Sequence, residues 1–394
     1  MQKLTAPIRL RIPLVVKGLR GSEIEDIDGN TYIDMDCGLG LQLLRFGVED
    51  LTVGLNIVSY PAGDVLSEYV YRLLDVSKGF FGEGYRFHLS PSGLEAFMTV
   101  YSSILEVSRG GSAVVFHIRN GVSVMDSSLS STIRKVPYPY CYRCPLKHEY
   151  PGCGYACVDY FKDVLDELEG SVSLVVFKPV DPFNCIVPPE PVWRRVVKAA
   201  HEAGCPVLCD ETDLAPGRSG KRLWFENLTI RPEAVCLGDG LASGLPIGLA
   251  AVREELAVWK PKPLKANPMS CIAGLRLLEM LRDGRLLSKA HKLGRSLRKR
   301  LEELSRRYEV PGDVRGLGLM VGFEVVEDES SKKPAQRWAR FLVKYCFTRG
   351  LILGLGPPST IRLTPPIDVD EETVEDALTI IEDGFKELKH MFKP

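Results

Sequence analysis

Short apolar runs alternate with amphipathic stretches through the middle of the chain. Residues 174–177 and 207–209 have the composition of buried strands, and apolar residues recur at helical spacing between them, over 192–203. Two further strand-like runs follow at 234–237 and 249–252. Strands that alternate with helices predict an α/β fold with a mostly parallel sheet covered on both faces. In such folds ligands bind at the carboxyl ends of strands.

The two ends of the chain have a different pattern. Residues 23–35 alternate apolar and polar positions around Asp28-Gly29, which predicts a β-hairpin. From residue 271 onward the pattern predicts a second, smaller α+β domain. Its expected elements are helices over 271–283, 285–308, 334–349 and 371–390, and strands over 319–325 and 361–363.

Composition narrows the classes of function. The 394 residues are 45% hydrophobic and 26% charged, with a formal net charge of −1, so nothing favours nucleic acid or an anionic membrane as a partner. No apolar run reaches the ~20 residues that span a bilayer, and the N-terminus does not have the pattern of a signal peptide. We therefore expect a cytoplasmic protein. Glutamine occurs only at positions 2, 42 and 336, which favours a thermophilic source.

Four of the eleven cysteines are clustered at Cys141, Cys144, Cys153 and Cys157. Their spacing permits a four-thiolate metal site. Disulfides are an alternative, because they form inside hyperthermophile cells, and free thiols are another. We favour disulfides or free thiols over a metal.

A glycine-rich stretch follows the apolar run 234–237, and Asp239 lies within it. Glycines so close together let a backbone approach a ligand. The stretch belongs to a set of segments that together resemble class III aminotransferases: "EIEDIDGNTYIDMDCGLG", "SPSGLEA", "VLCDETDLAPGRSG", "ANPMSCIAGLRLLEML" and "IRLTPPI". The resemblance implies the fold type I architecture of pyridoxal-phosphate (PLP) enzymes, with a large domain over 46–284 and a small domain over 1–45 and 285–394. It also implies a homodimer with sites between the subunits.

Several positions match the residues that bind ligands in that family. The resemblance places Asp210 at the cofactor's pyridinium nitrogen and Ser92 and Gly93 in the phosphate-binding turn. It places Arg362 at the substrate carboxylate. Arg362 has an alternative interpretation as a structural arginine that pairs with Glu324 or with a backbone carbonyl.

Other positions depart from the family pattern. Leu94 replaces the hydroxyl residue of the phosphate turn, and Asn120 lies where the ring-stacking element is expected. Asp213 stands in place of the glutamine at the ring hydroxyl, and Pro263 in place of a threonine that reaches the phosphate. Asp239 occupies the position of the Schiff-base lysine, and an aspartate cannot form an imine.

Lys178 replaces a glutamate that the family carries at a neighbouring strand end. We expect it to form a buried ion pair with Asp239, since paired replacement avoids a lone buried charge. The sequence thus favours a protein inactive in PLP chemistry, with no covalent PLP and a binding or regulatory role, or the inactive partner of an active paralogue. A small carboxylate is a candidate ligand. The alternative is an active aminotransferase that uses Lys178 on an amino-acid or ω-amino-acid substrate.

Overall fold

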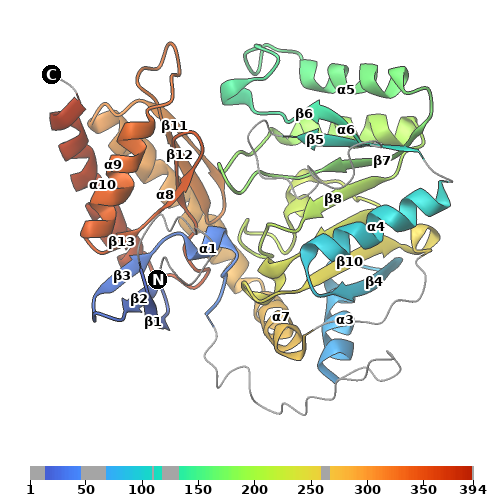
Figure 1. Ribbon diagram of the computed structural model, residues 1–394, viewed down its shortest axis with the longest axis horizontal. Coiled ribbons are helices and arrows are strands. Elements are labelled where there is room, and N and C mark those ends of the chain that lie inside the picture. The colour runs from blue at the N-terminus through green and yellow to red at the C-terminus, as the bar shows by residue number, and fades with distance from the viewer. Residues whose placement is uncertain (1–13, 46–67, 109–110, 118–132, 259–266, 393–394) are drawn as a thin grey trace, which may run out of the picture.

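A seven-stranded sheet forms the centre of the larger half of the protein (Figure 1). The computed structural model describes residues 14–45, 68–108, 111–117, 133–258 and 267–392. The strand order is β4-β10-β9-β8-β7-β5-β6. Only β10 runs against its neighbours, so the mostly parallel sheet is confirmed. The strands are β4 (Tyr85–Ser90), β5 (Ser112–His117), β6 (Ile133–Pro137), β7 (Val172–Phe177), β8 (Val207–Glu211), β9 (Ala234–Leu237) and β10 (Gly248–Arg253).

Helices cover both faces of this sheet, as the apolar runs predict. In β7, Leu174 and Val176 face the helix α4 (Gly93–Val107). Val175 and Phe177 pack on the other face, because successive strand residues point in opposite directions. That face is covered by α3 (Glu68–Phe81), α5 (Ala156–Glu167), α6 (Glu190–Glu202) and α7 (Pro268–Leu281).

Two smaller sheets combine the ends of the chain. The hairpin β2 (Glu23–Asp26) and β3 (Thr31–Asp34) forms as predicted, with β1 (Val16–Arg20) at its edge. The strand β13 (Leu351–Ile352) pairs in parallel with β3 and so ties the N-terminal segment to the C-terminal part of the chain. The third sheet is antiparallel, with strand order β11-β12-β15-β14. Its strands are β11 (Gly312–Leu317), β12 (Met320–Val325), β14 (Gly354–Gly356) and β15 (Thr360–Leu363).

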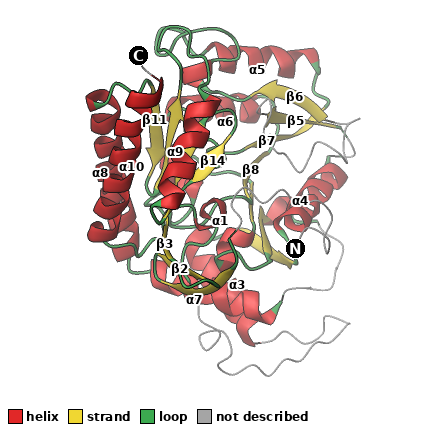
Figure 2. Ribbon diagram, turned by 60° about the vertical axis from the view of Figure 1, so that its left-hand side comes forward, coloured by secondary structure: helices red, strands yellow, loops and turns green. Residues whose placement is uncertain are grey.

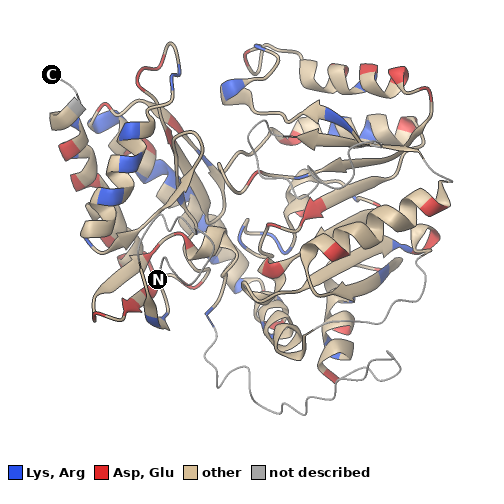
Figure 3. Cartoon of the chain, in the orientation of Figure 1, with Lys and Arg blue, Asp and Glu red and all other residues tan. Residues whose placement is uncertain are grey.

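Three long helices pack beside this third sheet: α8 (Arg285–Arg307), α9 (Gln336–Thr348) and α10 (Glu371–Phe392). Figure 2 shows them side by side, and α10 contacts both of the others. Ion pairs from Arg300 to Glu375 and from Arg307 to Glu382 join α8 to α10, whose acidic residues are visible in Figure 3. None of the described helices is both long enough and apolar enough to cross a bilayer.

Short helices complete the described chain. They are the α1 turn (Cys37–Gly40) and the 3-10 turns η2 (Cys141–Arg143), η3 (Trp224–Leu228), η4 (Asp239–Ala242) and η5 (Glu254–Leu256). Of these, α1 and η4 carry residues of the candidate site.

Candidate active site

Charged side chains converge where three neighbouring strands end. Lys178 directly follows β7, Asp210 lies near the end of β8, and Asp239 begins η4 after β9. Lys178 Nζ lies 3.4 Å from Asp210 Oδ2 and also forms an ion pair with Asp213. These strands are parallel and adjacent in the order β9-β8-β7, so their carboxyl ends meet at one edge of the sheet.

Asp210 has both of its carboxylate oxygens engaged. Oδ2 faces Lys178, and Oδ1 accepts hydrogen bonds from the backbone N–H of Thr212 at 3.0 Å and from its hydroxyl at 2.6 Å. Its neighbour Glu211 points the other way and accepts from the N–H groups of Trp224 and Phe225. The two adjacent carboxylates therefore do not face one site.

The expected ion pair between Lys178 and Asp239 is wrong. Lys178 is bound by Asp210 and Asp213, and no ion pair joins Asp239 to any cation within the described ranges. The cause lies in the sheet order, because β8 separates the end of β7 from the end of β9. Among the described residues, Asp239 accepts a single hydrogen bond, of 3.3 Å, from the Ile247 N–H.

These surroundings set the protonation of the two groups. Burial raises the pKa of Asp239 above its ordinary value, and the nearby Asp213 carboxylate adds to that effect against the Ile247 hydrogen bond. For Lys178, burial lowers the pKa, but the carboxylates of Asp210 and Asp213 outweigh burial and hold it above its ordinary value. Lys178 is thus an ammonium at neutral pH, and Asp239 has no cation paired with it among the described residues.

The turn before α4 packs against this edge of the sheet. Ser92 caps the helix, because its hydroxyl accepts a hydrogen bond of 3.3 Å from the Glu95 N–H. A Cβ added at Gly93 would lie 3.0 Å from the Cα of Gly238 and from the Cβ of Thr212, so the turn is in close contact with the strand ends. The structure therefore brings Ser92 and Gly93 next to Asp210 and Asp239, whereas Asn120 and Pro263 lie outside the described residues.

Arg362 lies on β15 and only 2% of it is exposed. Its Nε and Nη2 donate to Asp36 Oδ1 at 3.0 and 2.6 Å, and its Nη1 donates to the backbone carbonyl of Phe183 at 3.0 Å. Of the two structural partners that the sequence suggests, the backbone carbonyl is therefore present and Glu324 is not. The charged partner is Asp36, which the sequence did not single out.

Glu324 belongs to a separate buried cluster. It accepts from Tyr140 and Arg143, which flank the first clustered cysteine, and from Arg315 Nη2 at 2.9 Å. The Arg315 guanidinium also lies over the Tyr140 ring, 5.0 Å from its centre. This cluster joins the four-cysteine segment to the third sheet, and it explains why Glu324 is not available to Arg362.

The four clustered cysteines are free thiols in the structure. Burial raises the pKa of Cys141 and of Cys157 to about 11, and the charges of neighbouring clustered thiols contribute to both shifts. Within the part of the chain that is described, no group of three or more His, Cys, Asp or Glu side chains has the arrangement of a metal site. No disulfide joins these four cysteines to one another or to another described cysteine.

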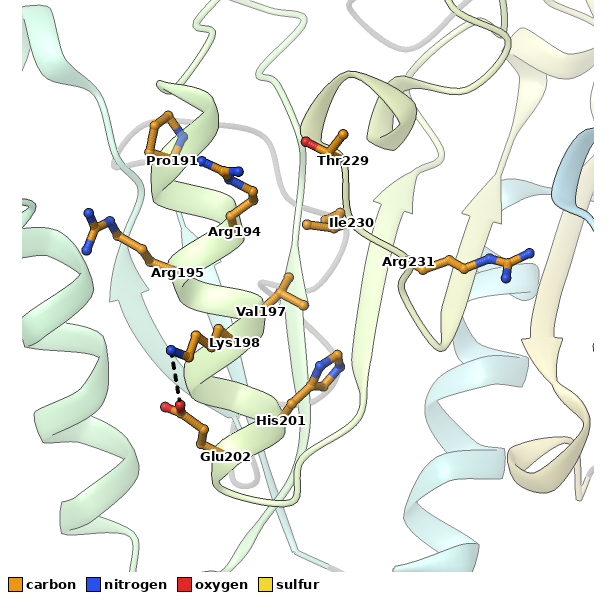
Figure 4. Close-up of a pocket in the computed structure, with 10 residues that line it drawn as sticks. All are labelled: Pro191, Arg194, Arg195, Val197, Lys198, His201, Glu202, Thr229, Ile230 and Arg231. Carbon is orange, nitrogen blue, oxygen red and sulfur yellow. Dashed lines mark ion pairs between the residues drawn. The ribbon is translucent and has the colours of Figure 1, made fainter.

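A surface groove of about 840 Å³ lies elsewhere, along α6 (Figure 4). Arg194, Arg195, Lys198 and His201 line it, together with Arg231. Arg195 stacks over Tyr155 and Lys198 pairs with Glu202. None of the residues that the sequence singled out lines this groove.

Comparison with known proteins identifies the family. The family described as aminotransferase class-III matches residues 117–385. The chain belongs to the class III aminotransferases. It is 31% identical to the leucine/methionine racemase of Thermococcus litoralis, over 70% of this chain and 62% of that relative. It is 27% identical to the diaminobutyrate–2-oxoglutarate aminotransferase of Rhizobium meliloti, over 96% of this chain and 89% of that enzyme.

Solved structures have the same fold as this chain. A Bacillus anthracis aminotransferase superimposes with a TM-score of 0.86 at 21% identity, over 98% of this chain and 96% of that one. The fold type I architecture of PLP-dependent transaminases is thus confirmed. The comparisons also include racemases and an epimerase, so membership of the family does not fix one reaction.

Proposed function

We propose that this class III aminotransferase forms no imine with PLP and acts as a binding or regulatory protein, or as the inactive partner of an active paralogue. The proposal rests on the family resemblance, which places Asp239 at the lysine position, and it is supported by one observation, the ion pair of Lys178 with Asp210. The family is PLP-dependent.

The described residues do not fit a covalently bound PLP. An imine needs an amine at position 239, and a carboxylate there lacks the nucleophilic nitrogen. Asp210, the expected partner of the pyridinium nitrogen, already has the Lys178 ammonium beside Oδ2 and two hydrogen bonds from Thr212 on Oδ1. A second cation next to Asp210 would be repelled by the Lys178 ammonium.

An active enzyme that uses Lys178 is the alternative. Its support is the position of Lys178 beside Asp210 and the many enzymes among the relatives. Against it stands the raised pKa of Lys178, because an amine must lose its proton before it attacks an aldehyde. Two carboxylates that stabilise the ammonium make this deprotonation harder.

The assembly also belongs to the proposal. The family resemblance implies a homodimer. We also propose a mixed dimer, in which this chain completes the site of an active subunit. Both assemblies are proposed for the cytoplasm. Light scattering on the purified protein tests the first. Co-expression with an intact class III aminotransferase, followed by pull-down, tests the second, and a homodimer that never exchanges subunits would contradict the partner role.

The visible absorption spectrum with added PLP tests the proposed inactivity. We expect no Schiff-base band that depends on Lys178, so the spectra of the wild type and of Lys178→Ala should match. The double variant Lys178→Glu/Asp239→Lys, which restores both family residues, is the positive control and should gain a band. A wild-type band that Lys178→Ala removes would support the enzyme and overturn the proposal.

A further inference from the structure

The groove along α6 is bordered mainly by basic side chains. Arg194, Arg195, Lys198 and His201 leave one side of the helix, because their spacing keeps them within about a third of its circumference. Arg231 lines the groove from the segment that follows η3. All five residues are exposed, so a ligand in solution has access to them.

Three of these basic side chains already have a carboxylate of the chain beside them. The pairs are Arg194–Glu190 at 2.8 Å, Lys198–Glu202 at 3.6 Å and His201–Glu233 at 3.1 Å. Two of the carboxylates are also held by hydrogen bonds of 2.9 Å, Glu190 by the Thr229 hydroxyl and Glu233 by the Val207 N–H. These pairs leave little positive charge for a ligand.

Arg195 and Arg231 are different, because neither forms an ion pair with a carboxylate of the described chain. The Arg195 guanidinium lies over the ring of Tyr155, 4.4 Å from its centre. Stacking of this kind holds the guanidinium plane and leaves its N–H groups free to bind a carboxylate. Figure 4 shows Arg195 on one side and Arg231 on the other, with Val197 and Ile230 between them. The groove therefore has two separate points at which it can bind an anion.

The lining between the two arginines is apolar. Val197 is 5% exposed, and Ile230 and Pro191 are half-buried. Along α6 the lining runs from Pro191 to Glu202, which is a length of about 16 Å at the helical rise of about 1.5 Å per residue. An extended peptide rises about 3.3 Å per residue, so about five of its residues span this length.

The distribution of charge favours a peptide over a nucleic acid. A nucleic acid presents a phosphate at every step of its backbone, and Glu190, Glu202 and Glu233 would repel that uniform charge. A peptide can place carboxylates at the two unpaired arginines alone and an apolar side chain on the lining between them. Complementary charge at the edges and apolar contact at the centre are the arrangement of a protein-protein contact.

We propose that the groove along α6 is the docking site for an acidic peptide segment of a partner protein, bound in an extended conformation over about five residues. Its carboxylates pair with Arg195 and Arg231, and an apolar side chain packs on Val197 and Ile230. The inference goes beyond the proposed function, because no residue assigned to the cofactor lines the groove. The same surface would serve an active enzyme, so the PLP spectrum and the docking experiment fail separately.

Selection of a phage-displayed library of random peptides on the purified full-length protein tests the proposal. Fluorescence anisotropy then measures the Kd of the selected peptides, labelled with fluorescein, at an ionic strength of about 0.15 M. We expect the selected peptides to be enriched in Asp and Glu, with an apolar residue between the acidic ones. Arg195→Glu/Arg231→Glu should bind them at least about tenfold more weakly, because the reversed charges repel the carboxylates.

The matched control is Lys292→Glu/Arg295→Glu, which changes the net charge by the same amount on the exposed side of α8 and should bind like the wild type. If the reversed groove variant does not fold, Arg195→Gln/Arg231→Gln removes the charges and should weaken binding at least about threefold. Selected peptides without an acidic bias, or an equal loss in the α8 control, would overturn the proposal.

Two other results would also overturn it. The first is a mixed-sequence oligonucleotide that binds the groove more tightly than the selected peptides do, which would make the groove a phosphate-backbone site. The second is a smaller assembly of Arg195→Glu/Arg231→Glu than of the wild type in light scattering, which would make the groove a contact between copies of this chain.

Discussion

Asp210 and Arg362 are the two charged residues that the family resemblance assigns to ligands, and the chain neutralises them in different ways. At the strand ends, Asp210 and Asp213 share the ammonium of Lys178, whose side chain is 23% exposed, and Asp239 forms no ion pair with any described residue. On β15, the buried Arg362 pairs with Asp36, whose side chain is 22% exposed. The first half holds two carboxylates against one partly exposed cation, and in the second half the cation is the buried member of its pair.

This difference follows from the cost of an unpaired charge. A buried ion that loses its partner costs several kcal/mol, whereas an ion that water reaches costs far less. Charge replacements can therefore accumulate at the strand ends, even with one carboxylate too many. At the buried Arg362, any replacement has to arrive with its counter-charge.

The largest effect is expected from breaking the ion pair between Asp36 and Arg362. Asp36→Ala should reduce the free energy of unfolding by about 3–5 kcal/mol, because it leaves the buried Arg362 guanidinium without an anion. Equilibrium unfolding in guanidinium chloride measures this loss. A loss below about 1 kcal/mol would show that water reaches Arg362 and would remove the contrast between the halves.

A smaller effect is expected at the strand ends. Lys178→Ala should cost about 1–2 kcal/mol at pH 7, since Asp210 and Asp213 lose their cation but remain partly hydrated. Equilibrium unfolding at pH 7 provides the test, and a variant as stable as the wild type would contradict the electrostatic account.

The smallest effect is expected at Asp239, and it has the opposite sign. Because the pKa of Asp239 is raised in the folded state, its contribution to stability is complete below its ordinary pKa near 3.8 and is lost as pH rises through the folded value. Asp239→Asn should therefore stabilise the protein at pH 7, by less than about 1 kcal/mol because water reaches the side chain, and should leave it unchanged near pH 3. Thermal unfolding at both pH values checks this, and a destabilised variant at pH 7 would mean that Asp239 has a cationic partner.

The sequence predicted the local parts of this structure well. Apolar runs located β7, β8, β9 and β10, and the helical pattern located α6 and the four helices after residue 268 within a few residues of their ends. Strands with weak patterns were missed, among them β11 (Gly312–Leu317), in which every residue is only partly buried.

Partners across the fold were harder to predict. Lys178 was assigned to Asp239 because the two replacements compensate in charge, but pairing depends on which strands are adjacent. Asp36 and Arg362 are 326 positions apart, and their segments are brought together by the pairing of β13 with β3 and by the hydrogen bond from the Thr364 N–H to the Met35 carbonyl. The one signal in the sequence was a second aspartate just after the hairpin, which is too common a feature to identify a partner.

Peptide mapping after borohydride reduction tests the central claim most directly. PLP is added to the wild type and to Lys178→Glu/Asp239→Lys, any imines are reduced to stable amines, and the modified lysines are located by mass spectrometry. We expect no stoichiometric phosphopyridoxyl group on Lys178 in the wild type and one on the new lysine in the double variant. Full modification of wild-type Lys178 would show that its amine reacts with PLP. That result would contradict the proposal that the chain forms no imine with PLP.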